Sequence, residues 1–444
     1  MAEFILMNKN TEIMVIKQNE LSLKFEDIYE VFYSEYAPFS VFQSMKKEKD
    51  EIVKELNAWF QLRVIPDYRD NKEELMRGLG VESSEELANK HYALSLSDQY
   101  WLKPMGSNIT WNNVNYFHNE YDSKEFFNVT YGEGSFRFLS IYGVRSDRFK
   151  SPNNTLTGQL KKTWVKINGE SYLFKGSCTL HNFEPINEVI ASKICEILDV
   201  PYVKYDLKHL HSKRQDALVS VCKCMINDTQ EIVPAYELIY ELDKVTETPE
   251  DYYLYLDLLK KHDVPFAEEH LQKMFMLDYI MLNEDRHMGN FGIIRNVDTL
   301  EWESVCPVFD TGRSNNSNVS EMYWNFEEGE VKCFTKEFVS SEILPKFFTV
   351  SLSVEQINEL KDMAKEFAIL LKRNQSYVKL FDEQIDRLGR GFEFRIQKFC
   401  EIMRQKGLVM CNVNEEIQKC DELFLKKSME RIEKFKNTKI DPER

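Results

Sequence analysis

The chain has 444 residues, of which 43% are hydrophobic and 29% charged, and it carries a net charge of −16. This length is enough for two or three domains with sizeable cores, and the negative charge argues against nucleic-acid binding as the main role, since phosphate backbones attract basic surfaces. The first residues lack a signal-peptide pattern, no apolar run reaches about 18 residues, and the nine cysteines are scattered, so we expect a cytoplasmic protein with free thiols and no membrane span.

The N-terminal region predicts a mixture of strands and helices. Residues 3–35 alternate apolar and polar side chains, which indicates two or three strands. Helical periods follow at 46–62 and 72–79, and Ser83 with Glu86 is an N-capping signal for a third helix. Such a region either binds a partner or packs as a layer on the rest of the chain, and the sequence favours neither.

Two less regular segments come next. Residues 94–117 are dense in aromatic and polar side chains without a clean period, and residues 120–148 are expected to be a linker.

A polar loop leads into a hairpin after this linker. Residues 150–159 favour a loop, and Asn168-Gly169 between two alternating runs is a strong hairpin signal. In a kinase small lobe, a loop at this place covers the phosphates of the nucleotide. The candidates for this contact are Ser151, Thr155, Thr157 and Gly158, although the loop is poor in glycine.

The second strand of this hairpin ends in Lys175. A lysine at the end of an apolar strand requires an anionic partner when it is desolvated. The helical period at 184–198 carries Glu188 near its start, and Glu184 is a competitor. A strand lysine paired with a helix glutamate positions the α- and β-phosphates in kinases.

Most of the remaining chain is expected to be helical. Strands are predicted at 201–207 and 217–225, where Cys222 and Cys224 lack the further ligands of a metal site. The later helices are expected at 236–242, 252–261 and 267–282, and again from 353 to the end, where we expect no catalytic residue.

The stretch from Met274 to Ser314 holds most of the candidate catalytic and metal-binding residues. Its apolar run predicts a buried helix that ends near Asn283, followed by a loop and two strands at 291–294 and 305–309. The loop holds Asp285, Arg286, His287 and Asn290, and the second strand leads to Asp310 in an Asp-Thr-Gly turn. If the two strands pair, the loop and Asp310 face each other.

These residue types suit phosphoryl transfer from a nucleotide. Asp285 would orient or deprotonate the acceptor hydroxyl, and Asn290 with Asp310 would hold Mg²⁺ on the phosphates. The Asp-x4-Asn spacing followed by Asp-Thr-Gly matches the order found in protein kinases. Asp-Thr-Gly is also the aspartic-protease signature, but that chemistry needs a second copy, which only a homodimer could supply here.

The motifs DRHMGN and PVFDTG resemble those of the HipA-like serine/threonine kinases and, more distantly, of the phosphatidylinositol kinases. The resemblance covers roughly residues 145 to 400 and implies an α+β, two-lobed protein-kinase-like fold. It comprises an N-terminal α/β accessory region, a small lobe built on an antiparallel sheet and a mostly helical large lobe, with bounds at 1–145, 146–226 and 227–444.

The resemblance also assigns site residues. It gives Lys175 and Glu188 the phosphate-positioning roles and makes Cys222, Cys224 and Met225 the hinge against which adenine would pack. Arg286 and His287 would shape the catalytic loop or stabilise charge. Residues 313–320 take the place of a mobile activation or substrate loop.

The function expected on these grounds is an ATP- and Mg²⁺-dependent kinase that phosphorylates serine or threonine of a protein, itself included. The resemblance further implies an antitoxin-like protein partner in a toxin–antitoxin pair. The net charge and the lack of an apolar span lead us to expect neither direct nucleic-acid binding nor a membrane partner. A lipid or small-molecule kinase and a nucleotide-binding pseudokinase are the alternatives. The intact Asp285, Asn290 and Asp310 argue against the pseudokinase.

Overall fold

The alternating residues at the start of the chain form the first sheet. The computed structural model describes residues 1–69, 72–79, 81–131, 150–156, 158–211, 216–239, 242 and 245–410. Strands β1 (Ala2–Asn8), β2 (Thr11–Gln18) and β3 (Phe25–Val31) confirm the prediction and form an antiparallel sheet in the order β3-β2-β1-β4. The fourth strand, β4 (Tyr100–Pro104), comes from the aromatic segment that showed no period.

Helices α1 (Phe39–Ser44) and α2 (Lys49–Gln61) pack in one cluster with this sheet, and α5 (Trp111–Val114) packs in another. Helix α3 (Lys72–Leu79) packs in a separate cluster with Phe126, to which α4 (Ser84–Lys90) contributes Leu87. Leu56 and Phe60 of α2 pack into the core beneath the sheet. The Ser83 side chain accepts a hydrogen bond from the Glu86 amide, as the capping signal predicted.

The predicted linker is wrong in its first half. Residues Lys124–Tyr131 form helix α6, whose Phe126 packs with Ile65 and Leu87 of the N-terminal region. The Tyr131 hydroxyl donates to the carbonyl oxygen of Lys161 at 2.6 Å. The segment is therefore a packed connection, while residues 132–149, with the predicted boundary at 145, lie outside the described residues.

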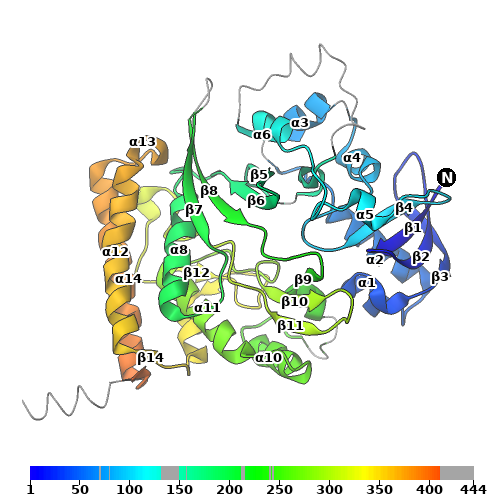
Figure 1. Ribbon diagram of the computed structural model, residues 1–444. Coiled ribbons are helices and arrows are strands. Elements are labelled where there is room, and N and C mark those ends of the chain that lie inside the picture. The colour runs from blue at the N-terminus through cyan, green and yellow to red at the C-terminus, as the bar shows by residue number, and fades with distance from the viewer. Residues whose placement is uncertain are drawn as a thin grey trace, which may run out of the picture.

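A second antiparallel sheet follows, in the order β5-β6-β8-β7 (Figure 1). Its strands are β5 (Lys162–Ile167), β6 (Glu170–Lys175), β7 (Tyr205–Leu210) and β8 (Ala217–Lys223). The predicted turn has positive φ at both Asn168 and Gly169, as a type I′ hairpin requires. Helix α8 (Glu184–Leu198) contacts β7 and β8, and β7 begins four positions after the predicted start at Pro201 because Tyr202 instead bridges to Val308.

The remainder is mostly helical around one extended core (Figure 1). Its main helices are α9 (Ala235–Leu238), α10 (Asp251–Lys261), α11 (Ala267–Met281), α12 (Val354–Arg373) and α14 (Asp382–Gln405). A small sheet in the order β11-β10-β9 consists of Trp302–Val305, Gly292–Asn296 and Gln230–Pro234. The short elements are η1 (Ser34–Tyr36), η3 (Pro152–Thr155), η5 (Glu321–Tyr323), β12 (Glu330–Val331), β13 (Val339–Ser340), η6 (Ser341–Phe347), β14 (Leu352–Ser353), α13 (Gln375–Val378) and β15 (Val409–Met410).

The predicted α+β class is confirmed. Among the described residues, none of the helices has the length and apolar character required to cross a bilayer.

The N-terminal region packs against the small sheet of the large lobe. Arg295 of β10 has its Nε 2.6 Å from Glu231 of β9, and it donates to the Tyr100 hydroxyl of β4 at 3.1 Å. Both charged side chains are at most 4% exposed. Nearby, the Ile232 amide donates to the Ser97 carbonyl oxygen at 2.9 Å. The sequence left open whether the N-terminal region binds a partner or packs as a layer on the rest of the chain. The structure shows that it packs as a layer.

Replacing Arg295 by methionine is expected to destabilise the protein by about 3–5 kcal/mol, because Glu231 would remain as a buried carboxylate without its cation. Urea unfolding measures this change. Lys9→Met is the control, because it removes the more exposed ion pair with Asp298 between the same two regions and should cost about 1 kcal/mol or less. Equal losses in the two variants would contradict the assignment.

Candidate active site

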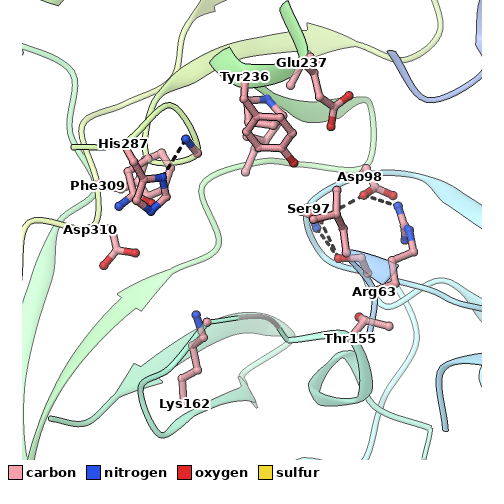
Figure 2. Close-up of a pocket in the computed structure, with 18 of the residues that line it drawn as sticks. Arg63, Ser97, Asp98, Thr155, Lys162, Tyr236, Glu237, His287, Phe309 and Asp310 are labelled. Carbon is pink, nitrogen blue, oxygen red and sulfur yellow. Dashed lines mark hydrogen bonds and ion pairs between the residues drawn. The ribbon is translucent and has the colours of Figure 1, made fainter. Parts of the chain in front are cut away.

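A cavity of about 630 Å³ opens between the N-terminal region, the β5–β6 hairpin and the loop after α11 (Figure 2). The residues of the predicted site that line it are Thr155, Gly158, Met225, Asp285, His287, Asn290 and Asp310. Segments far apart in the sequence thus meet at one place.

The loop after α11 is organised by Arg286. Helix α11 ends at Met281, and Leu282 adopts a left-handed conformation (φ +50°) that turns the chain out of the helix. The Arg286 guanidinium is 1% exposed, bonds the Asp278 carboxylate at 3.0 Å, and donates to the carbonyl oxygens of Asn290 and Phe309 at 2.9 and 2.6 Å. Since these donors face the protein interior, the geometry favours loop shaping over a catalytic contact for Arg286.

The side chains of Asp285, His287 and Asn290, all from this loop, line the cavity. The Asn290 side-chain nitrogen donates to the Asp285 carbonyl oxygen at 2.8 Å, which leaves its oxygen for another contact. The His287 ring accepts a hydrogen bond from the Gly289 amide at 3.0 Å, so it is fixed within the loop. Burial raises the pKa of the half-buried Asp285 carboxyl, and the negative charge of Asp310 acts in the same direction.

Lys175 links helix α8 to the Asp-Thr-Gly turn. Its ammonium forms ion pairs with Glu188 and, at 2.6 Å, with Asp310. Glu188 also accepts a hydrogen bond from the Thr311 amide at 3.0 Å. Glu184, in contrast, accepts hydrogen bonds from Ser177 and from the backbone and hydroxyl of Thr179, so it holds the loop before α8. The ion pair predicted from the sequence is therefore formed by Glu188.

Two lysines shift the pKa values of the carboxylates in this cluster. Burial alone would raise the pKa of Asp310, but the positive charges of Lys175 and Lys162 outweigh it and hold this pKa well below its ordinary value. Burial raises the pKa of Glu188, and Asp310 adds to this effect. The ammoniums of Lys175 and Lys162 thus both act on the Asp310 carboxylate and keep it ionised.

The donor set around Asp310 fits Mg²⁺. The carboxylate of Asp310 and the side-chain oxygen of Asn290 are hard oxygen ligands, which this ion prefers. Asp310 has φ +54°, a conformation that is uncommon for a residue with a side chain.

The predicted phosphate loop is only partly at the cavity. Ser151 is fully buried, accepts a hydrogen bond from the Asn153 side chain at 2.9 Å, and does not line the cavity. Thr155 lines the cavity, and its hydroxyl donates to the Leu94 carbonyl oxygen at 2.8 Å. Gly158 also lines it, whereas Thr157 lies outside the described residues.

The three predicted hinge residues differ in their surroundings. Met225 lines the cavity, where its thioether could pack against a flat ring. Cys222 is buried in β8 and packs in the cluster of Val189 and Tyr205, which excludes it from direct contact with a ligand in this cavity. The Cys224 amide donates to the Ser171 carbonyl oxygen at 2.8 Å. Burial raises the thiol pKa of Cys222 to about 12 and that of Cys224 to about 11, so both are neutral thiols.

The expectation of a mobile segment at 313–320 is wrong in its first half. Ser314, Asn315 and Ser317 are at most 1% exposed. The Asn187 side chain of α8 donates to the carbonyl oxygens of Gly312 and Ser314 at 2.8 Å each. These serines are therefore buried, and the segment fixes the turn that carries Asp310.

Sequence reasoning missed two basic residues of the cavity. Lys162 is the first residue of β5 and lies directly opposite Lys175 in the hairpin. This position could have been found by counting back from the Asn168-Gly169 turn. Arg313 lies after the Asp-Thr-Gly turn, and it donates to the Gln159 side chain at 3.0 Å, which joins the large lobe to the loop before β5.

The cavity thus lies where the N-terminal region meets two further parts of the chain, a small lobe and a large lobe. The small lobe contributes an antiparallel sheet with helix α8, and the mostly helical large lobe contributes the loop after α11 and the Asp-Thr-Gly turn.

No protein-family model matches the sequence, and no curated protein matches it. Solved structures do match. The proinflammatory kinase CtkA of Helicobacter pylori is 17% identical over 55% of this chain and 93% of its own, with a TM-score of 0.39. HipA of Shewanella oneidensis MR-1, in a toxin–antitoxin complex with HipB and operator DNA, is 12% identical over 90% and 96%, with a TM-score of 0.46. A golgi casein kinase is 12% identical over 73% and 91%, with a TM-score of 0.32.

Proposed function

We propose that this protein is a Mg²⁺-dependent kinase that transfers the γ-phosphoryl group of ATP to a serine or threonine hydroxyl of a protein. The observation that carries the proposal is the contact of the buried Lys175 with Glu188 and Asp310, because Asp310 lines the same cavity as Asp285 and Asn290. Phosphoryl transfer depends on positioning and charge stabilisation, and this cluster supplies groups for both.

Each residue has a role in the proposed reaction. Lys175 would bind the α- and β-phosphates, held in place by Glu188. Asn290 and Asp310 would hold Mg²⁺, which neutralises charge on the phosphates when bound. Asp285 would accept the proton of the acceptor hydroxyl while the hydroxyl oxygen bonds to the γ-phosphorus and ADP leaves.

The acceptor would be a protein segment, which includes the chain itself, and an antitoxin-like protein is a further proposed partner. Free thiols support a reducing compartment such as the cytoplasm: in the described part of the chain, Cys195, Cys222, Cys224, Cys306, Cys333 and Cys400 form no disulfide.

Incubation of the purified protein with labelled ATP and Mg²⁺ tests the proposal. We expect label on serine or threonine, either of this protein or of a protein in an added lysate, and we expect its loss when the metal is chelated. Label on extracted lipid would favour the lipid-kinase alternative. Tight ATP binding without any transfer would favour the pseudokinase.

Asp310→Ala is expected to make nucleotide binding insensitive to Mg²⁺, because the ionised carboxylate would no longer hold the metal against the phosphates. Calorimetry of ATP binding with and without Mg²⁺ measures this effect. Asp298→Ala, on the exposed turn between β10 and β11, is the matched control. An equal Mg²⁺ enhancement in Asp310→Ala and in the unmodified protein would exclude Asp310 as a ligand.

A further inference from the structure

Lys162 is the cross-strand neighbour of Lys175 in the β5–β6 hairpin. The two residues are directly opposite each other on β5 and β6, and Lys162 lines the cavity. In Figure 2 its ammonium points toward the side of the cavity that carries Asp310. The nitrogen also lies close to Gly158, since a Cβ atom at that glycine would be only 2.6 Å from it. A residue with a side chain at 158 would therefore displace the ammonium.

The two lysines differ in their partners. Lys175 is paired with Glu188 and Asp310, whereas the ammonium of Lys162 forms no ion pair or hydrogen bond with any side chain or carbonyl group of the described residues. Like charges opposite each other on adjacent strands are destabilising, and an ammonium removed from water without a partner adds a further cost. Burial accordingly lowers the pKa of Lys162 to about 8, although Asp310 acts in the opposite direction.

The N-terminal region fixes the backbone of this lysine. Arg69 is 4% exposed and donates to the carbonyl oxygens of Leu156 and Lys162 at 3.1 and 2.7 Å. These two contacts hold the backbone at Leu156 and at Lys162, on either side of Gly158. A positioned cation without a protein partner is typical of a binding site for an anion.

We propose that Lys162 is a second phosphate-binding lysine, which contacts the terminal β- and γ-phosphates of the bound nucleotide. This inference rests on the proposed function. The terminal phosphates are favoured because Lys162 points toward the side of Asp310, and in kinases the metal held by the corresponding carboxylate bridges these two phosphates. Lys175 then serves the α- and β-phosphates, and the cross-strand repulsion is relieved when the nucleotide binds.

Affinities for ATP, ADP and AMP, measured by calorimetry at constant Mg²⁺, test the inference. Lys162→Met should weaken ATP and ADP binding by about 10- to 100-fold, because a charge-assisted contact is lost, and should change AMP binding by less than about threefold. Lys162→Arg keeps the charge and should retain ATP and ADP binding to within about fivefold of the unmodified protein. Lys161→Met is the matched control, because the known contacts of Lys161 use its carbonyl oxygen.

The outcomes separate this inference from the proposed function. If the unmodified protein binds none of the three nucleotides, both fail. If it binds ATP but Lys162→Met binds ATP and ADP within about twofold of it, only the role of Lys162 is overturned. An equal loss for all three nucleotides overturns the assignment to the terminal phosphates. Thermal melting should be unchanged or raised in Lys162→Met, since an unpaired, partly buried charge is removed, and this result distinguishes lost binding from misfolding.

Discussion

Replacing Asp285 by asparagine is expected to slow phosphoryl transfer by about 10²- to 10⁴-fold, while ATP binding remains nearly unchanged. Asparagine has the same shape but cannot accept the proton of the acceptor hydroxyl. The carbonyl oxygen of Asp285, which accepts a hydrogen bond from Asn290, is retained, so the loop should keep its conformation. Single-turnover transfer from labelled ATP, together with calorimetry, separates the two effects.

Two further measurements make this prediction specific. Asp298→Asn makes the same chemical change outside the cavity and should leave transfer unaffected. Since burial raises the pKa of Asp285 above its ordinary value of 3.8, the base form is lost at a less acidic pH than for an exposed aspartate. The transfer rate should therefore fall as the pH decreases through this raised pKa. A variant that retains most of its activity would exclude Asp285 as the base.

The second large effect is expected at Lys175. Lys175→Met should weaken ATP binding or slow transfer by more than about tenfold, because the phosphates lose a charge-assisted contact in a partly desolvated cleft. Glu188→Gln should have a smaller effect of the same kind, since Lys175 would keep its ion pair with Asp310. The double variant should be no worse than Lys175→Met alone, because residues that act as a unit are not additive.

The control for this cycle lies on the same helix. Glu196 is an exposed residue of α8, and Glu196→Gln should leave both binding and transfer unchanged. Denaturant unfolding of each variant is needed as well, because Lys175→Met leaves Glu188 and Asp310 without their cation. Fully additive losses in ATP binding would mean that Lys175 and Glu188 do not act together.

Local sequence patterns were sufficient to predict many of the helices, strands and turns of the fold. The hairpin around Asn168-Gly169, helix α8, helix α11 and the N-cap at Ser83 all lie where the sequence predicted them. These signals come from residues close together in the chain, such as a turn that needs positive φ or an apolar face repeated every helical turn. The same reasoning failed for β4 and α6, because pairing with β1 and packing against Ile65 are contacts with distant segments.

In the candidate site, too, some features could be predicted from the sequence and others are seen only in the structure. The sequence by itself determined the residue types and spacing of Asp285, Asn290 and Asp310, and the strand lysine at position 175. Only the tertiary structure decided that Glu188 is its partner, that Arg286 is used inside the loop, and that Lys162 faces the cavity. The physical reason is that these outcomes depend on contacts across long stretches of chain, such as the 135 positions between Lys175 and Asp310, where charge and burial are set by the packing of both lobes and the N-terminal region.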